Sequence, residues 1–540
     1  MSREKNQLHR PGLHRADPSS GRSGGRPKEE GAPSGSYLHT GKEGTEGQNA
    51  SAANQGRAPL AGKTSRPKRR LRRSNLHAPV IHNTEFTVIS SVFVALFIAV
   101  GAYFIHFMVQ EGDYYRNNAY NPRLSVAEAR VTRGDILSSD GKVLASSKDG
   151  NRSYPFEDVY AHAVGYNSNG KGGVELQEND TLLRSHVSPV RRIQNLFAGK
   201  KDQGDNVTLT LDSKIQQAAY GAIGNHKGAV VVLDPDTGKI LAMVSKPDFD
   251  PNKLEKNWDK LSTDKDQAAL VNRANQGLYP PGSTFKIVTS LAYLRQNNGS
   301  DHNFSYDCTG TFSKAGYTIH CFGNEKHGRE NLTQAFGNSC NTAFSNVGLS
   351  LNYEQWKQTA GDMLFDTNLP TDLSNSATSK FQLAKSDGAA AIMQTAIGQG
   401  NTLVTPIHMA MLASAVANGG KLMRTYIKDK VTSEDGLPVY SAEARQAGQL
   451  MTSAEADQLK SYMRYVVTNG TARSINSKSY TIYGKTGTAE YNSEKDSHSW
   501  FVGFAEQDQK KVAVAVILEE VGGTSTSATS AAGAVFKACF

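Results

Sequence analysis

The sequence has little cysteine and few long apolar runs, and both shortages limit what the protein can be. Its 540 residues include four cysteines, too few for a domain held together by disulfide bonds. Two of them, Cys308 and Cys321, bracket a 12-residue insert. Outside the cytoplasm these two could form a disulfide bond, or they could remain partly buried free thiols. The sequence leaves both alternatives open.

Apolar runs long enough to cross a membrane are also scarce, because the chain has a single one, at residues 86–109. These 24 residues contain no Asp, Glu, Lys or Arg, and about 20 apolar residues suffice to span the hydrocarbon core. A cleavable signal peptide would have a shorter apolar region nearer the N-terminus. The run therefore predicts one transmembrane helix that anchors the protein in a membrane.

Acidic residues are scarce in the N-terminal tail, residues 1–85. Residues 1–80 contain 16 Lys and Arg but 6 Asp and Glu, so the net charge of +9 belongs to the tail. Few large apolar side chains occur there, which predicts disorder. The basic stretch 68–73 could suggest a nucleic-acid partner, but it lies just ahead of the apolar run. We therefore expect no nucleic acid and, by the positive-inside rule, a cytoplasmic tail with residues 110–540 outside the membrane.

Turn signals and alternating apolar residues divide the remaining chain into two parts. Residues 110–206 are polar, contain a hairpin pattern at 133–145, and are predicted to form a small, mostly β domain with turns at its glycines. Residues 207–540 have strands at both ends around a long helical middle, which predicts α+β packing. Hairpin patterns at 229–244 and 500–518 mark those two ends.

Ser283 and Lys286 form a Ser-x-x-Lys pattern that follows Pro-Pro-Gly. The pattern is weak by itself, because it recurs elsewhere, as at Ser65 and Lys68, and an ordinary capping serine with a surface lysine also produces it. The apolar run after Lys286, however, predicts a buried helix that begins at Ser283 and carries Lys286 on the same face. A serine hydroxyl needs a neighbouring base, and a lysine becomes one when burial or a second cation lowers its pKa.

Two further short motifs follow in order along the chain. Ser-Cys-Asn at 339–341 begins a run with helical spacing, and Lys-Thr-Gly-Thr at 485–488 follows a strand-like segment. A glycine within a strand, here Gly487, indicates a place where the backbone approaches a ligand closely. Ser-x-x-Lys, Ser-x-Asn and Lys-Thr-Gly in this order are the signature set of β-lactamases and penicillin-binding proteins.

The chain resembles class B penicillin-binding proteins over roughly residues 86–540. The resemblance extends beyond the three motifs to Arg133-Gly134-x-Ile136, Asn272-Arg273-Ala274, His327-Gly328, Ile397-Gly398-Gln399-Gly400, Ala417-Asn418-Gly419 and Trp500-Phe501-Val502-Gly503. It implies an α+β fold: a serine β-lactamase-like transpeptidase domain at 207–540, with an antiparallel sheet and a helical subdomain. This domain would stand on a pedestal domain at 110–206.

The catalytic roles of the family carry over onto the matching positions. By this resemblance Ser283 is the nucleophile that attacks the penultimate D-Ala carbonyl of a peptidoglycan stem peptide, and Lys286 is its base. Ser339 would relay a proton to the leaving amine, Asn341 would position Lys286, and Lys485 would set the local field. The residues expected at the terminal carboxylate of the substrate are Thr486, Gly487 and Thr488.

The same resemblance places the oxyanion hole at the backbone N–H groups of Ser283 and Thr488, where charge develops in the tetrahedral intermediate. It implies no metal and no organic cofactor, and it gives Cys340 no catalytic role. The insert between Cys308 and Cys321 leads into the second motif, so we expect these two cysteines to lie near one another beside the active-site cleft.

The resemblance predicts a peptidoglycan D,D-transpeptidase that β-lactam antibiotics acylate. A class A β-lactamase would carry a Glu-x-x-Leu-Asn string between the second and third motifs, and the sequence has none. A D,D-carboxypeptidase, a β-lactam sensor and an inactive cell-wall scaffold stay open as alternatives. Residues 110–206 are too few for a glycosyltransferase domain, which implies a partner: a polytopic membrane glycosyltransferase of the shape, elongation, division and sporulation class.

Overall fold

The structure, a computed structural model, describes residues 84–118, 121–148, 150–489, 496–522 and 527–540. It begins with α1 (Thr84–Gln110), a 27-residue helix with a mean hydropathy of 2.5 in its most apolar part and no buried side chain. At 1.5 Å per residue α1 is about 40 Å long, enough to cross a hydrocarbon core of about 30 Å. The helix fits the predicted single-pass anchor. The predicted disorder of residues 1–85 lies outside the described residues, except for Thr84 and Glu85.

The segment from 112 to 206 contains more helix than the sequence patterns predict. Its helices are α2 (Gly112–Asn117), α3 (Pro122–Arg130), η1 (Glu157–Tyr160), α4 (Ala161–Val164), α5 (Gly173–Gln177), α6 (Asn179–Leu183) and α7 (Pro189–Phe197). Its strands are β1 (Val131–Thr132), β2 (Ile136–Leu137), β3 (Val143–Lys148), β4 (Asn151–Ser153) and β5 (Asp202–Gln203). The prediction of a mostly β domain is therefore wrong, whereas the hairpin predicted at 133–145 is confirmed by the antiparallel pairing of β2 with β3.

Two glycines help to explain this difference. Gly165 and Gly173 have positive φ angles of +87° and +58°, as the predicted turns would require. They also sit where two helices meet, because a Cβ on Gly165 would lie 1.8 Å from Gly172 O and one on Gly173 would lie 2.7 Å from Gly165 N. The glycines allow α4 and α5 to pack closely, a contact that turn statistics do not reveal.

A buried ion pair network holds this segment together. The guanidinium groups of Arg133 and Arg152 pair with the fully buried carboxylate of Glu175, at Nε–O distances of 2.6 and 2.7 Å. Burial alone would raise the pKa of Glu175, but the two arginine charges lower it below its usual value. A Cβ on Gly134 would lie 2.0 Å from Asp205 O, so any other residue at position 134 would clash with the backbone of Asp205.

Two larger sheets organise the rest of the chain. The first has the order β15-β14-β6-β2-β3-β4 and adds to the strands above β6 (Asn206–Leu209), β14 (Lys428–Thr432) and β15 (Pro438–Ser441). The second is antiparallel with the order β17-β18-β19-β7-β8, formed by β7 (Gly228–Leu233), β8 (Ile240–Lys246), β17 (Thr481–Ala489), β18 (His498–Gln507) and β19 (Lys510–Leu518). The hairpins predicted at 229–244 and 500–518 are confirmed by the pairs β7–β8 and β18–β19.

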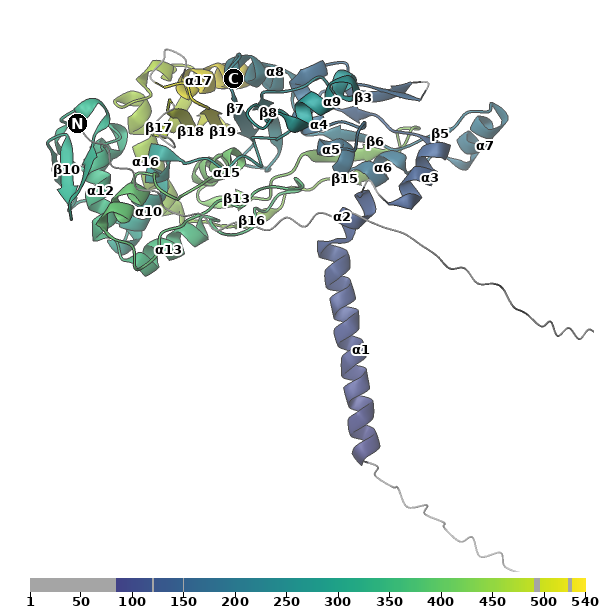
Figure 1. Cartoon of the computed structure of the whole chain (residues 1–540), viewed down its shortest axis with the longest axis horizontal. Coiled ribbons are helices and arrows are strands. Elements are labelled where there is room, and N and C mark those ends of the chain that lie inside the picture. Colours follow the sequence, from purple (N-terminus) through teal and green to yellow (C-terminus); the bar gives the residue numbers. More distant parts are fainter. Residues whose placement is uncertain (1–83, 119–120, 149, 490–495, 523–526) are drawn as a thin grey trace, which may run out of the picture. The chain divides into compact units, whose positions relative to one another are not determined.

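Helices cover both faces of the five-stranded sheet (Figure 1). On one face α8 (Ser213–Ile223) packs with α17 (Ala528–Cys539), and on the other lies α15 (Pro406–Ala417), whose 12 residues are all buried. The carboxylate of Asp212 accepts the Ile215 N–H at 2.9 Å and caps α8. The sheet is therefore the middle layer of an α+β domain.

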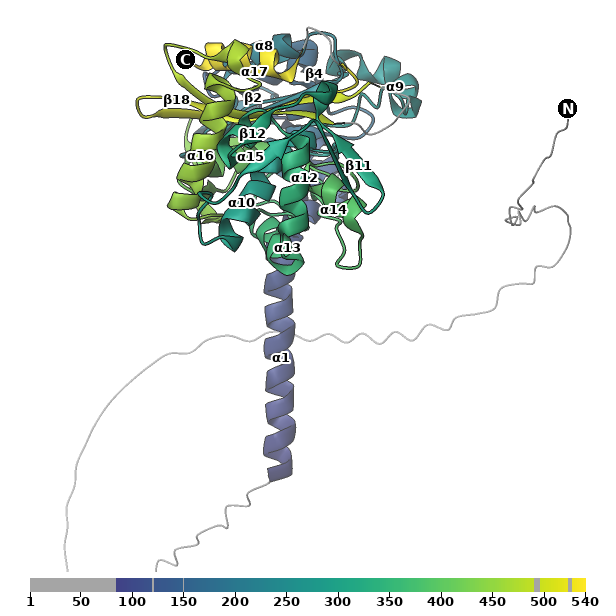
Figure 2. The ribbon, with the colours of Figure 1, turned by 90° about the vertical axis from the view of Figure 1, so that its left-hand side faces the viewer.

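The helical subdomain lies on the α15 side of this sheet, as α10, α12 and α13 show in both views (Figures 1 and 2). Its helices and the nearby connections are η3 (Gly282–Phe285), α10 (Lys286–Gln296), η4 (Phe322–Asn324), α11 (Leu332–Gly337), α12 (Asn341–Ser350), α13 (Tyr353–Asp362), α14 (Ala389–Ala396), α16 (Ser453–Thr468) and η5 (Arg473–Ile475). Two other elements, η2 (Pro251–Lys253) and α9 (Leu254–Thr263), lie outside it, where Leu254 packs with Ala161 of α4. Small two-stranded sheets pair β9 (Tyr306–Cys308) with β12 (Gly328–Glu330), β10 (Thr311–Lys314) with β11 (Tyr317–His320), and β13 (Lys421–Met423) with β16 (Gln446–Gln449).

Candidate active site

Ser283 lies on η3, the 3-10 turn that leads directly into α10. Lys286 is the first residue of α10, so the predicted helix after Ser283 is confirmed, with a short 3-10 turn at its start. Gly282 has a φ of +52°, and a Cβ there would lie 2.4 Å from Thr488 O. The glycine therefore allows the turn that carries Ser283 to press against strand β17, which carries the third motif.

Lys286 is fully buried, and its amine has three oxygen neighbours. Its Nζ donates to the Ser339 carbonyl at 2.7 Å and to Asn341 Oδ1 at 2.8 Å, and it lies 3.2 Å from Ser339 Oγ. Burial disfavours the charged ammonium and lowers the pKa of Lys286 to about 8. A fraction of this amine is then neutral near physiological pH, as a general base requires.

Lys485 reaches the same serine from β17. Its side chain is fully buried, and its Nζ donates to Ser339 Oγ at 2.9 Å and to the Thr486 carbonyl at 3.0 Å. Burial, followed by the positive charge of Lys286, lowers the pKa of Lys485 well below its usual value. The Ser339 hydroxyl therefore bridges two buried amines that disfavour being charged at the same time.

Ser339 and Asn341 make these contacts from the start of α12. Ser339 has a positive φ of +57°, which is uncommon for a residue with a side chain. Asn341 Nδ2 donates to His320 O at 3.1 Å, which orients the amide so that its oxygen faces Lys286. Cys340, between the two, is the N-cap residue of α12. A single short segment thus supplies all three oxygens around the Lys286 amine.

The Ser283 hydroxyl makes no hydrogen bond with any residue that the structure describes, although Ser283 lines the cleft. The Lys286 amine is directed to Ser339 and Asn341 instead. Catalytic hydrogen bonds are often incomplete without substrate and form in the complex. The nucleophile that the sequence predicts is therefore open to the cleft and one turn away from its predicted base.

The third motif lies on β17, the edge strand of the five-stranded sheet. A Cβ on Gly487 would lie 2.9 Å from a side-chain carbon of Thr284 and 3.1 Å from Pro281 O. Gly487 thus allows β17 to approach the η3 turn, and it also lines the cleft, so the predicted approach of a ligand stays a prediction. The Thr486 hydroxyl hydrogen-bonds that of Thr471 at 2.5 Å. Thr471 lies in a loop without a motif, which is why sequence patterns do not point to it.

One cleft, with a volume of about 1750 Å³, collects the motif residues. Those that line it are Ser283, Ser339, Asn341, Thr486, Gly487 and Thr488. Lys286 and Lys485 lie buried beside it, in contact with Ser339. The structure therefore brings all eight predicted site residues together. The cleft exceeds the roughly 300–1,000 Å³ typical of small-molecule sites, which suits a peptide substrate.

Sequence motifs do not reveal a second group of side chains beside this cleft. The Sγ atoms of Cys308 and Cys321 lie 3.7 Å apart, and Cys321 lines the cleft, so the predicted proximity of these two cysteines is confirmed. All four cysteines are free thiols, not disulfide-bonded. Cys340 and His327 join the pair. The spacing of these four residues along the sequence does not indicate a common zinc motif, because it lacks the closely spaced ligand pairs of such motifs.

Family models match two consecutive parts of the chain. Residues 228–540 match the penicillin binding protein transpeptidase domain, and residues 133–207 match the penicillin binding protein A dimerisation domain. The first match covers more than half of the chain. The matched residues 228–540 include all the residues with a predicted catalytic role.

Individual relatives agree with these models. Peptidoglycan D,D-transpeptidase PbpA of Mycolicibacterium smegmatis is 32% identical over 481 residues, which is 83% of this chain and 96% of that protein. The D,D-transpeptidase domain of a peptidoglycan glycosyltransferase from Eggerthella lenta has a TM-score of 0.68 at 32% identity, covering 76% of this chain and 98% of that one. Penicillin-binding protein A from M. tuberculosis, as an imipenem acyl-enzyme complex, has a TM-score of 0.69 at 30% identity, covering 76% and 99%. The chain therefore belongs to the class B penicillin-binding proteins.

Proposed function

We propose that this chain is a peptidoglycan D,D-transpeptidase that works through an acyl-enzyme on Ser283 and that β-lactams acylate at the same residue. The observation that carries the proposal is the meeting of two buried amines of lowered pKa at Ser339, in the cleft that Ser283 lines. Relatives support the proposal. M. smegmatis PbpA is named a D,D-transpeptidase, and structures of M. tuberculosis penicillin-binding protein A contain acyl-enzyme complexes with imipenem and penicillin G.

Acylation begins with the neutral amine of Lys286. It accepts the Ser283 hydroxyl proton while Oγ bonds to the carbonyl carbon of the penultimate D-Ala. The backbone N–H groups of Ser283 and Thr488 stabilise the negative charge on the carbonyl oxygen. The proton then passes from Lys286 through Ser339 to the nitrogen of the terminal D-Ala, whose C–N bond breaks. Ser339 suits this relay because its Oγ lies 3.2 Å from Lys286 Nζ and 2.9 Å from Lys485 Nζ.

The third motif binds the terminal carboxylate of the substrate. Thr486 and Thr488 line the same cleft as Ser283, with Gly487 between them. An anion near the Lys485 amine would raise its pKa, because an opposite charge favours the ammonium form. Lys485 would therefore regain its proton when substrate binds, so its field acts on the bound substrate more than on the free enzyme.

Deacylation transfers the peptide to a second stem peptide. The acceptor amine attacks the ester carbon of the acyl-enzyme, loses a proton to the base, and forms an amide as the bond to Ser283 Oγ breaks and Ser283 regains its proton. A D,D-carboxypeptidase would use water in place of the amine. The cleft volume of about 1750 Å³ supports transpeptidation, because it leaves room for an acceptor chain.

The domain division and membrane topology are part of the same proposal. A pedestal domain at 110–206 and a transpeptidase domain at 207–540 are supported by family matches that end at 207 and begin at 228. The apolar helix α1 and the basic tail support a cytoplasmic N-terminus and an extracytoplasmic catalytic domain. Glycan strands would come from a partner, a polytopic membrane glycosyltransferase of the shape, elongation, division and sporulation class.

The test combines a synthetic donor stem peptide and an amine acceptor with the full chain in detergent. A cross-linked product and a penicillin adduct on the peptide that contains Ser283 are expected by mass spectrometry. Ser290→Ala is the matched control, because Ser290 is a buried serine on α10 whose hydroxyl has no hydrogen-bond partner among the described residues. Hydrolysed donor alone would indicate a carboxypeptidase, acylation by penicillin without stem-peptide turnover a sensor, and no adduct a scaffold.

A further inference from the structure

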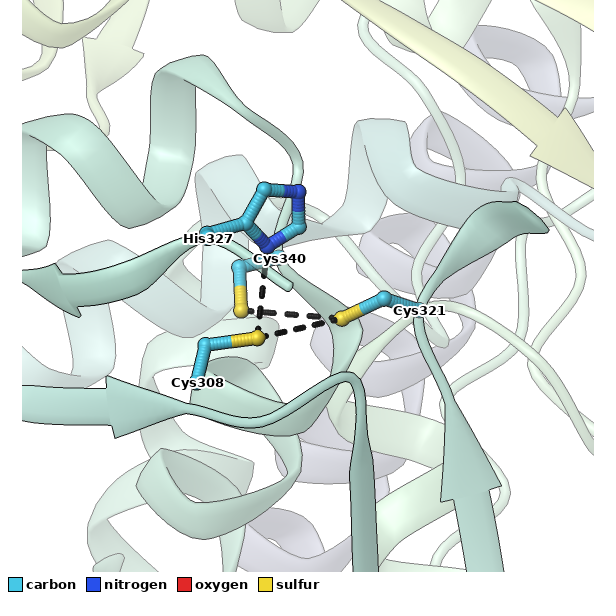
Figure 3. Close-up of side chains that lie close together, drawn as sticks. All are labelled: Cys308, Cys321, His327 and Cys340. Carbon is cyan, nitrogen blue, oxygen red and sulfur yellow. Dashed lines mark hydrogen bonds between the residues drawn. The ribbon is translucent and has the colours of Figure 1, made fainter. Parts of the chain in front are cut away.

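Three cysteines and one histidine from separate segments converge next to the second motif, and we call them the Cys–His cluster (Figure 3). Its members are Cys308 at the end of β9, Cys321 directly after β11, His327 directly before β12 and Cys340 directly before α12. The cysteines are buried, and the His327 side chain is 11% exposed. The sulfur atoms point toward one another with the imidazole beside them. The proposed reaction uses none of these four side chains.

The distances within the cluster fit a tetrahedron around one metal ion. The Sγ atoms of Cys308 and Cys321 lie 3.7 Å apart, as do those of Cys321 and Cys340. Cys308 Sγ lies 3.3 Å from His327 Nδ1, and all four ligand atoms lie within 4.8 Å of one another. With metal–sulfur bonds of about 2.3 Å and a metal–nitrogen bond of about 2.0 Å, a tetrahedron has edges of about 3.8 Å between sulfurs and about 3.5 Å between sulfur and nitrogen.

The surroundings of the cluster suit a bound cation. The Thr342 hydroxyl lies 3.2 to 3.5 Å from all three sulfurs. Glu330 is buried, and its Oε2, 3.9 Å from His327 Nδ1, makes no hydrogen bond with a described residue. In the part of the chain that the structure describes, no Lys or Arg pairs with Glu330 or hydrogen-bonds a cluster sulfur. A buried carboxylate requires a compensating charge, and a divalent cation would supply it.

We propose that the Cys–His cluster binds one divalent cation, with Zn²⁺ as the best match. Thiolate and imidazole ligands in a tetrahedral arrangement favour zinc among the divalent metals. Four protein ligands fill the coordination sphere and leave no position for water or substrate, so the site is structural. The assignment does not depend on the proposed transpeptidase activity, because no substrate or catalytic step enters it.

The metal would position the second catalytic motif. Cys340 is covalently joined to Ser339 and Asn341, whose oxygens accept the Lys286 amine at 2.7 and 2.8 Å. Ser339 holds a φ of +57°, a conformation that costs free energy and persists only where the surroundings fix it. A metal bond to the adjacent Cys340 would fix it. Cys340 is therefore a positioning residue, because it acts on Lys286 through its two neighbours.

A disulfide bond between Cys308 and Cys321 is the competing arrangement. An oxidising compartment would favour it, and it would remove two of the four ligands. Cys340 and His327 would then be left as two ligands, too few for a closed tetrahedral site. The two arrangements exclude each other, so metal and disulfide content measured on one preparation distinguish them.

The first experiment measures the metal bound by the full chain, isolated from membranes in detergent and then loaded with Zn²⁺ or Co²⁺ alone. We expect one ion per chain and a Co²⁺ absorption spectrum with the intense bands of tetrahedral thiolate ligation. A chain that binds no stoichiometric metal would overturn the proposal. So would a Cys308–Cys321 disulfide found by peptide mapping of the protein as isolated.

Substitutions then separate the cluster from other cysteines. Cys308→Ser and His327→Gln each remove a ligand and should lower metal affinity by more than the roughly 10–100-fold typical of outer-shell changes. Cys539→Ser is the matched control, because Cys539 is a buried free thiol on α17 outside the cluster. Equal metal content in Cys308→Ser and Cys539→Ser would overturn the assignment. If Cys308→Ser does not fold, the Co²⁺ spectrum of the unaltered chain decides the question.

The positioning role has its own readout. Removing the metal with a chelator should slow acylation by a fluorescent penicillin, and adding Zn²⁺ back should restore the rate. Ser283→Ala should bind one ion while showing no acylation, so failure of the metal proposal and failure of the proposed function give different results. Equal acylation rates with and without the metal would overturn the positioning role.

Discussion

The catalytic cleft and the Cys–His cluster are neighbours that bury polar groups in opposite ways. In the cleft, the amines of Lys286 and Lys485 are the buried groups, and oxygens of Ser339 accept hydrogen bonds from both. In the cluster, sulfur, imidazole and the carboxylate of Glu330 gather instead. Burial makes the first region reactive, because it lowers the pKa of an amine. In the cluster, burial of the sulfurs and of the Glu330 carboxylate favours the binding of a cation. The difference suggests that the cleft performs the chemistry and the cluster holds its geometry.

The largest effect is expected from Ser283→Ala, which should disable the cleft and leave the cluster intact. Covalent penicillin binding should be lost, because the substitution removes the nucleophile. The fold should persist, since Gly282 and the apolar residues of α10 still specify the turn and the helix. Mass spectrometry of the penicillin-treated protein locates the adduct. An adduct on a peptide without Ser283, or unchanged labelling of Ser283→Ala, would contradict the assignment.

Lys286→Ala should slow acylation by about 10²- to 10⁴-fold, the usual contribution of a general base. In the unaltered chain the acylation rate should rise as pH increases through about 8 and level off above it, because the amine acts only without its proton and burial lowers the pKa of Lys286 to about 8. The rise should be absent in Lys286→Ala. The measurement is the second-order acylation rate against pH. A rate that falls as pH increases toward 8 would rule out Lys286 as the base.

Lys485→Ala should have a smaller effect, about 10²-fold, by weakening the field on the substrate and the binding of its carboxylate. The rise of the rate with pH should remain, because Lys286 is still present. Lys511→Ala is the control, since Lys511 lies on β19 of the same sheet and pairs with Asp236 away from the cleft. Loss of the pH dependence in Lys485→Ala would show that the two lysines have exchanged roles.

The two regions also differ in how far the sequence predicts them. Each catalytic motif is a short string with fixed spacing, so Ser283, Lys286 and the Lys485 strand could be placed from the sequence. The structure brings them together, with Ser283 lining the cleft and both lysines buried beside it at Ser339. The Cys–His cluster could not be placed in this way. Its ligands follow or precede β9, β11, β12 and α12, and only the packing of these elements brings them together. The sequence predicted the proximity of Cys308 and Cys321, without a role for Cys340.

The segment 112–206 shows a second limit of sequence patterns. Its helices have four to nine residues, too few turns for an apolar period of 3.6 to become visible. Its stability rests on distant partners instead, such as Arg133 with Glu175, 42 residues apart. Strand β6 also pairs with β14, from far downstream. Contacts of this kind depend on the tertiary fold, so the helical content of this segment was missed.

Thr342→Val should disturb the cluster and leave the catalytic residues in place. Valine keeps the shape of threonine but removes the hydroxyl that contacts the three sulfurs. Affinity for Zn²⁺, measured by competition with a chelator, should fall about 10- to 100-fold, as for other outer-shell changes. Thr359→Val is the control, because the buried Thr359 hydroxyl bonds the Gln355 carbonyl within α13 at 2.9 Å. Equal affinities in the two variants would show that Thr342 does not support a metal.

The smallest effect is expected from removing residues 1–109, which contain no member of either region. The helix α1 has no buried side chain, so its loss exposes no core. Residues 110–540 should therefore be soluble, bind one metal ion and react with penicillin at an unchanged rate, measured beside the full chain. The solved E. lenta domain, which matches 76% of this chain, shows that a related catalytic part can be studied alone. Activity in cells should nevertheless be lost, because the anchor places the enzyme at the membrane. If the folded 110–540 chain bound no penicillin, residues 1–109 would have to contribute to the geometry of the cleft.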